Sequence, residues 1–145
     1  MAISKILTPV DGSPASLRAV DLALEMLAQT PGGSLVLLNV QNVGSVDPLG
    51  VAAMAPPDWF RDVASRASEQ ALSNAISKCE GANIAFKALV RAGQVAKTIA
   101  DVSHEEDAGQ IVMGTRGLGG IQGLLLGSVA TQVIHLAEAP ITLIK

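Results

Sequence analysis

The chain has 145 residues, of which 49% are hydrophobic and 2% aromatic, and its formal net charge is −3. This length is typical of one domain, and the apolar content excludes an intrinsically disordered chain, so we expect a single domain over residues 1–145. The acidic balance, with no cluster of Lys and Arg, argues against nucleic-acid binding, because such proteins need positive charge to replace condensed counterions.

The first third of the chain predicts a strand, a helix and a second strand. Residues 3–10 form a short apolar run that ends at a turn signal, as a buried strand does. Ser13 is a suitable N-cap and Pro14 suits the first helical position. Apolar residues then recur at helical spacing before a Pro-Gly-Gly stop, and residues 35–40 read as a second buried strand.

The remaining elements alternate in the same way. Residues 41–57 contain several Gly and Pro and no clear period, which indicates a long loop. A helix should follow from residue 58, with one face formed by Phe60, Val63, Ala67, Ala71, Ala75 and Cys79. The patterns then predict a strand at 84–90, a helix at 95–106, a strand at 110–114, a helix at 128–138 and a strand at 140–145.

This alternation predicts an α/β protein with one open, parallel, five-stranded sheet. Parallel strands need crossover connections, and right-handed crossovers through helices cover both faces of the sheet. The strands are nearly continuous apolar runs, as expected for strands buried on both faces.

A glycine-rich segment between the strand at 110–114 and the helix at 128–138 is the strongest functional signal. It holds six of the fourteen glycines of the chain: Gly114, Gly117, Gly119, Gly120, Gly123 and Gly127. Glycine leaves backbone N–H groups uncovered, and a helix N-terminus adds free N–H groups and a positive dipole end, so the segment suits a phosphate. It does not fit a Rossmann fingerprint, because Gln122 occupies the place of the third glycine, and it lacks the lysine of a Walker A loop.

The spacing of Gly114, Gly117, Gly127 and Ser128 matches the G-2x-G-9x-G-S/T motif. With the segments at 6–13, 111–117, 127–130 and 139–141, it makes nearly the whole chain resemble the ATP-binding branch of the universal stress protein family. The chain departs from the family pattern at Gly109-Gln110, where Asp-Leu is more common, and at Asn39-Val40, where His-Val is common.

The resemblance implies strand order 3-2-1-4-5, a Rossmann-like fold related to the adenine-nucleotide α-hydrolases, and ATP bound with or without Mg²⁺ or Mn²⁺. The ligand would lie at the switch point between the first and fourth strands, where open α/β sheets bind ligands. The implied ligand contacts fall into groups. Pro9, Val10 and Asp11 line the nucleoside side, with Asp11 near ribose or a metal-linked phosphate; Val40 contacts adenine; Met113 and Gly114 border base and ribose; Gly117, Gly127, Ser128 and Val129 hold phosphates.

Several of these residues have simpler interpretations. The glycine segment could be a flexible connector or a close helix–sheet contact, and Asp11 could be a turn residue or helix cap. A solvated side chain is the favoured interpretation for Arg116. His104 and His135 have no partner at metal-ligand spacing, and Glu105, Glu106 and Asp107 read as surface charge in preference to a metal cluster. Cys79 reads as helix core, and no catalytic residue or protein-bound metal site is predicted.

Three functions remain open from the sequence. The favoured one is a regulatory module or switch that binds ATP and hydrolyses it slowly or not at all. The alternatives are a slow ATPase or nucleotide transferase, and a ligand-free stress-response interaction protein. The resemblance also implies a homodimer through the C-terminal strand. With no secretory signal pattern and no apolar run long enough to span a bilayer, we expect a cytoplasmic protein that contacts neither membrane nor nucleic acid.

Overall fold

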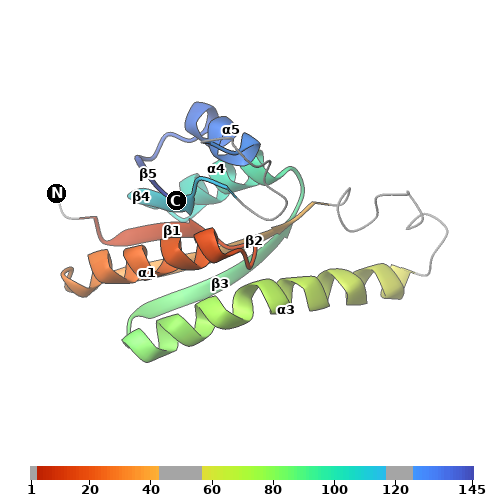
Figure 1. Ribbon diagram of the computed structural model, residues 1–145, viewed down its shortest axis with the longest axis horizontal. Coiled ribbons are helices and arrows are strands. Elements are labelled where there is room, and N and C mark those ends of the chain that lie inside the picture. Colours follow the sequence, from red (N-terminus) through yellow and green to blue (C-terminus); the bar gives the residue numbers. More distant parts are fainter. Residues whose placement is uncertain (1–2, 43–56, 117–125) are drawn as a thin grey trace.

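The computed structural model describes residues 3–42, 57–116 and 126–145, with only the backbone described for residues 57–64. Most of the predicted 41–57 loop, and residues 117–125 of the glycine segment, lie outside the described residues. The elements shown in Figure 1 are β1 (Lys5–Pro9), α1 (Pro14–Ala28), β2 (Ser34–Gln41), α3 (Pro57–Ala82), β3 (Ala85–Ala92), α4 (Val95–Glu105), β4 (Gln110–Gly114), α5 (Ser128–Leu136) and β5 (Ile141–Ile144).

The five strands form one parallel sheet in the order β3-β2-β1-β4-β5, which confirms the predicted fold class and strand order. Leu7 in the central strand pairs with Val36 of β2 on one side and with Ile111 of β4 on the other. Helices α1 and α3 cover one face of the sheet, and α4 and α5 cover the other (Figure 1). None of the helices in the described ranges combines the length and hydropathy needed to cross a bilayer.

The start of α1 is fixed by the local sequence, as predicted. The Ser13 side chain accepts a hydrogen bond from the Ser16 backbone N–H at 3.2 Å, and Pro14 occupies the first helical position. The cap satisfies one of the N–H groups that a helix start leaves without an intrahelical partner. It also fixes where the chain turns from the end of β1 into the helix.

The core consists of two apolar layers, one on each face of the sheet. Alternate residues of β2 point to opposite faces, so Leu35 and Leu37 join the α1–α3 layer while Val36 and Leu38 join the α4–α5 layer. Cys79 is completely buried in the first layer, which confirms the prediction that it is a core residue. Because both layers pack against the central strands β1, β2 and β4, the ends of these strands are held rigidly.

Two predictions about the later elements are wrong. The apolar run of β3 predicted a strand buried on both faces, but β3 is an edge strand with mostly exposed residues, and Val90 is 47% exposed. The final helix ends at Leu136 and not at residue 138, because Ala137 is already extended with φ −81° and ψ 140°. A helix cannot continue normally through Pro140, which lacks a backbone N–H and would clash with the preceding turn, so the chain leaves the helix before this residue and enters β5.

Candidate functional site

The turn after β1 is stabilised by the side chain of Asp11, which belongs to the turn. The Asp11 carboxylate accepts a hydrogen bond from the Ser13 backbone N–H at 2.9 Å. Gly12 has a φ of 86°, which a glycine adopts without strain, and a Cβ at this position would lie 3.3 Å from Ala71 Cα. Asp11 therefore has the turn role that its sequence position suggests, at the carboxyl end of the central strand.

A residue that the predicted site does not include, Asn39, ties β2 to this turn. Asn39 is 3% exposed, and its amide donates a hydrogen bond to the Val10 carbonyl at 2.8 Å. The Gln41 side-chain amide donates in turn to the Asn39 side-chain oxygen. The available signal was a polar residue inside an apolar strand, at a position where the chain departs from the family pattern.

The end of β4 packs tightly against the start of α1. A Cβ added to Gly114 would lie 2.9 Å from the Ala15 Cβ, closer than carbon atoms approach in proteins. Gly114 thus allows α1 and β4 to lie against each other. This is the close helix–sheet contact that the sequence left as an alternative.

The start of α5 lies next to the carboxyl end of β4. The Gly127 N–H donates to the Thr115 carbonyl at 2.6 Å, and a Cβ on Gly127 would lie 3.0 Å from that carbonyl oxygen. Thr115 is also linked to the edge strand, because its N–H donates to the Ile144 carbonyl at 2.8 Å. The Gly127 N–H is therefore occupied by the protein itself.

The first turn of α5 has backbone N–H groups without an intrahelical partner. The first intrahelical bond runs from the Thr131 N–H to the Gly127 carbonyl at 3.0 Å, so the N–H groups of Ser128, Val129 and Ala130 precede the helical ladder. The N-cap Gly127 supplies no side-chain bond to them, and Ser128 is exposed. These three N–H groups and the positive end of the helix dipole form an anion-binding geometry.

The other predicted site residues divide between the two faces of the sheet. Val40, Met113 and Val129 belong to the α4–α5 layer, whereas Val10 is buried in the α1–α3 layer. Pro9 is half-buried at the end of β1. Val40, Met113 and Val129 thus share one apolar layer, while Gly117 lies outside the described residues.

Three further groups that could take part in other chemistry are Cys79, His135 and Arg116. Burial, and to a lesser degree the neighbouring Glu80 charge, together raise the pKa of the Cys79 thiol to about 11, so the nucleophilic thiolate is scarce at neutral pH. His135 and Arg116 are exposed, the latter as predicted. Within residues 3–42, 57–116 and 126–145, no three His, Cys, Asp or Glu side chains gather closely enough to hold a metal.

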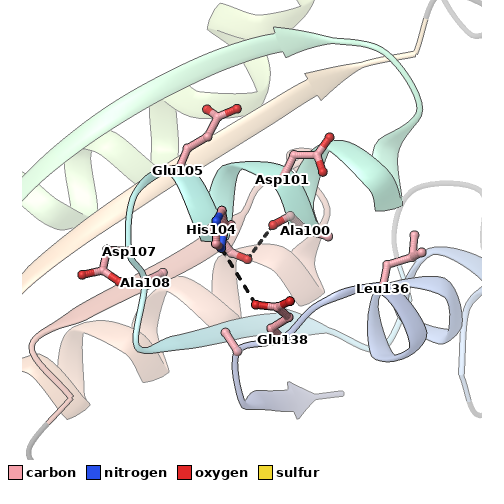
Figure 2. Close-up of a pocket in the computed structure, with 10 residues that line it drawn as sticks. Ala100, Asp101, His104, Glu105, Asp107, Ala108, Leu136 and Glu138 are labelled. Atoms are coloured by element: carbon pink, nitrogen blue, oxygen red, sulfur yellow. Dashed lines mark hydrogen bonds and ion pairs between the residues drawn. The ribbon is translucent and has the colours of Figure 1, made fainter.

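A separate groove of about 540 Å³ lies between α4 and the segment that joins α5 to β5 (Figure 2). His104 lies near its centre and is 3.9 Å from the Glu138 carboxylate, and both side chains are more than four-fifths exposed. The acidic side chains that line the groove are those of Asp101, Glu105, Asp107 and Glu138. Their like charges disfavour a phosphate there, because close negative charges repel one another.

Glu106, which was predicted with Glu105 and Asp107 to be surface charge, differs from these neighbours in its contacts. Its side chain is only 15% exposed, and its carboxylate lies 2.6 Å from the Lys87 ammonium on β3. The hydrogen bond from Lys87 holds the pKa of Glu106 below its ordinary value, and the charges of Lys87, Lys5 and Arg91 lower it further, against the opposing effect of desolvation. The backbone carbonyl of Glu106 accepts a bond from Lys5 at 3.0 Å, so Glu106 ties α4 to β1 and β3.

Comparison with known proteins gives a consistent result. A sequence model of the universal stress protein family matches residues 2–145. Universal stress protein YxiE of Bacillus subtilis is 26% identical, over 98% of this chain and 99% of its own length. The solved structure of hypothetical protein MJ0577 has a TM-score of 0.83 at 21% identity, over 100% of this chain and 97% of that chain. A universal stress protein solved in complex with cAMP has a TM-score of 0.71 at 25% identity, over 100% and 99% of the two chains.

Proposed function

The chain belongs to the universal stress protein family, and we propose that it binds ATP and acts as a nucleotide-dependent regulatory module. The observation that supports this most directly is that three elements meet at the carboxyl ends of the central strands. The turn after β1, the end of β4 and the N-terminus of α5 are joined there by the paired strands and by the bond between Gly127 and Thr115. This is the switch point where open α/β sheets bind ligands.

The proposed pose places the phosphates at α5. The N–H groups of Ser128 and Val129 and the Ser128 hydroxyl would be their donors, with Gly117 as a further donor from the glycine segment. Val40 and Met113 would offer apolar contact to adenine, and Pro9, Val10, Asp11 and Gly114 would border the nucleoside. Because its N–H is occupied by Thr115, Gly127 contributes by letting the helix start close to β4. A related structure that contains cAMP supports an adenine nucleotide as the ligand.

We propose slow hydrolysis or none. Residues 114–128 contain no lysine, and phosphoryl transfer depends on positioned positive charge. The Asp11 carboxylate already accepts a hydrogen bond from the turn, so its role would be to help hold a divalent ion carried by the phosphates. A bound nucleotide would then act by favouring whichever conformation it binds best.

A homodimer through β5 is also proposed. β5 is an edge strand whose four residues are all half-buried, and Ile134 on the adjacent α5 is 44% exposed. An apolar strand edge is a natural pairing site for a second copy. Sedimentation equilibrium at roughly tens of micromolar should show a dimer, and a monomer there would contradict the proposal.

The test of nucleotide binding has two steps. The purified protein is first denatured and the supernatant assayed for ATP, ADP and AMP, and nucleotide-free protein is then titrated by calorimetry with ATP, cAMP and GTP, with and without Mg²⁺. We expect ATP to bind and GTP to bind more weakly. Ser128→Ala should weaken ATP binding by about 0.5–1.5 kcal/mol, the contribution of one hydrogen bond, while Ser73→Ala, at an exposed serine of α3, should not change it. No binding by the parent chain would refute the proposed function.

A further inference from the structure

We propose that Asn39 is a positioning residue for the nucleotide site, an inference that rests on the function proposed above. The amide of Asn39 does not lie on the face where we expect adenine. It lies on the α1–α3 face of β2, with Leu35 and Leu37, whereas Val40 points to the α4–α5 face. Its effect on the ligand would therefore pass through the backbone that it holds.

The hydrogen bond of Asn39 acts on the peptide that enters the turn. The amide donates to the Val10 carbonyl at 2.8 Å, and this carbonyl belongs to the same planar peptide unit as the Asp11 N–H. The Val10 N–H is bonded on its other side to the Leu38 carbonyl at 2.8 Å. With both ends of Val10 tied to β2, the direction in which Asp11 leaves the sheet is fixed before any ligand arrives.

The orientation of the Asn39 amide is itself controlled. Gln41, half-buried at the end of β2, donates to the Asn39 side-chain oxygen. This bond leaves the Asn39 nitrogen as the atom that faces the Val10 carbonyl. Since Asn39 is 3% exposed, water cannot readily replace its amide as a donor to that carbonyl. Gln41 thus orients the Asn39 amide, Asn39 holds the Val10 carbonyl, and the Val10 peptide fixes the direction of Asp11.

The experiment compares ATP affinity and unfolding free energy in matched variants of the full chain. Asn39→Leu keeps a similar volume but removes the donor, and we expect ATP affinity to fall about tenfold. Asn39→His supplies a ring N–H at the same place and should restore affinity to within about threefold of the parent chain. Gln41→Leu, which removes only the orienting bond, should weaken ATP binding about threefold.

The control is a second buried side-chain amide, at the amino-terminal end of β4. Gln110, 8% exposed at the start of β4, donates to the Thr142 hydroxyl. Gln110→Met should lower stability while leaving ATP affinity unchanged, because the amide lies at the amino end of its strand. If Gln110→Met weakened ATP binding as much as Asn39→Leu, general loosening would explain both and the inference would be wrong.

The outcomes separate the inference from the proposed function. A parent chain that binds no adenine nucleotide refutes both. A parent chain that binds ATP while folded Asn39→Leu binds it equally well refutes the inference alone. If Asn39→Leu does not fold, the half-buried Gln41 decides: parent-like affinity in Gln41→Leu overturns the inference, and a threefold loss supports it.

Discussion

Two regions of this molecule could hold a ligand, and they differ in charge. The groove beside α4 is the more obvious hollow, but it is lined by four carboxylates and by His104. The β1–β4 edge, where the carboxyl ends of β1 and β4 lie, offers N–H groups of α5 that have no intrahelical partner, and a turn that is held from both sides. The comparison teaches that the placement of donors, and not the size of a cavity, identifies where a polyanion would bind.

The two regions also differ in how firmly they are built. In the groove, Asp101 pairs with Lys97 at 2.6 Å at the surface, and such exposed pairs contribute little stability. The β1–β4 edge depends on backbone contacts that tolerate no added atom at Gly114 and little at Gly127. Substitutions at the edge should therefore have large effects, and substitutions in the groove small ones.

The largest effect is expected from Gly114→Val. The new side chain would meet Ala15 at 2.9 Å or less, and this overpacking should lower the free energy of unfolding by about 1–3 kcal/mol and weaken ATP binding with it. Denaturant titration measures the first effect and calorimetry the second. Gly81→Ala is the control, since nothing lies within 4 Å of its Cβ position. An unfolding midpoint for Gly114→Val equal to that of the parent chain would show that the edge is not tightly packed.

A paired substitution at Asp11 separates its turn role from a ligand role. Asp11→Ala removes the acceptor for the Ser13 N–H and should cost about 1 kcal/mol of stability. Asp11→Asn keeps an oxygen acceptor and should leave stability near that of the parent chain. If the carboxylate helps to hold a divalent ion, both variants should lose the gain in ATP affinity that Mg²⁺ produces. Retention of that gain in Asp11→Asn would leave Asp11 a turn residue only.

One polar group in the strand that leads to the edge is unmatched. The Thr8 hydroxyl on β1 is fully buried and has no hydrogen-bond partner among the described residues. Thr8→Val should therefore raise the free energy of unfolding by about 1 kcal/mol, because the buried unpaired hydroxyl is removed. Thr98→Val is the control and should be destabilising, since the Thr98 hydroxyl donates to the Gln94 carbonyl at 2.7 Å. A loss of stability in Thr8→Val would indicate that the hydroxyl has a partner after all.

A smaller effect is expected at Glu106, the acidic residue that pairs with Lys87 on β3. The folded-state pKa of Glu106 is lowered, chiefly by its hydrogen bond with Lys87, so its ion pair contributes stability above the ordinary glutamate pKa. That contribution is lost as the pH falls through the lower folded-state value. The stability difference between the parent chain and Glu106→Gln should thus shrink from about pH 7 to about pH 3. A difference that stays constant over this range would contradict the assignment, and Glu105→Gln serves as the exposed control.

The elements that the sequence predicted well are those with local causes. Ser13 and Pro14 define the start of α1 by chemistry contained within four residues, and β4 spans residues 110–114 as its short apolar run predicted. The strand order came from the family resemblance and is confirmed. Asp11 was recognised as a turn residue because the Asp-Gly pair is a local signal.

What the sequence did not predict depends on neighbours that are distant along the chain. The run at β3 looks like a buried strand, and only its place at the sheet edge makes Val90 exposed. Asn39 finds its partner at Val10 and Glu106 finds Lys87, both through strand register and packing. Apolar periodicity contains no information about such pairs, since it reports which face a residue occupies and not what lies opposite.

The smallest effect is expected from neutralising the groove. The variant Asp101→Asn, Glu105→Gln, Asp107→Asn, Glu138→Gln removes all four carboxylates that line it. If ATP binds at the β1–β4 edge, these charges act only through solvent, and at about 0.15 M salt the screening length is about 8 Å. ATP affinity should then rise by less than about twofold, with a larger rise at low salt. Calorimetry at two salt concentrations provides the measurement, with Ser128→Ala as the comparison that does lose affinity. If the quadruple variant lost ATP binding while Ser128→Ala kept it, the groove would be the nucleotide site, with a cation bridging its carboxylates to the phosphates.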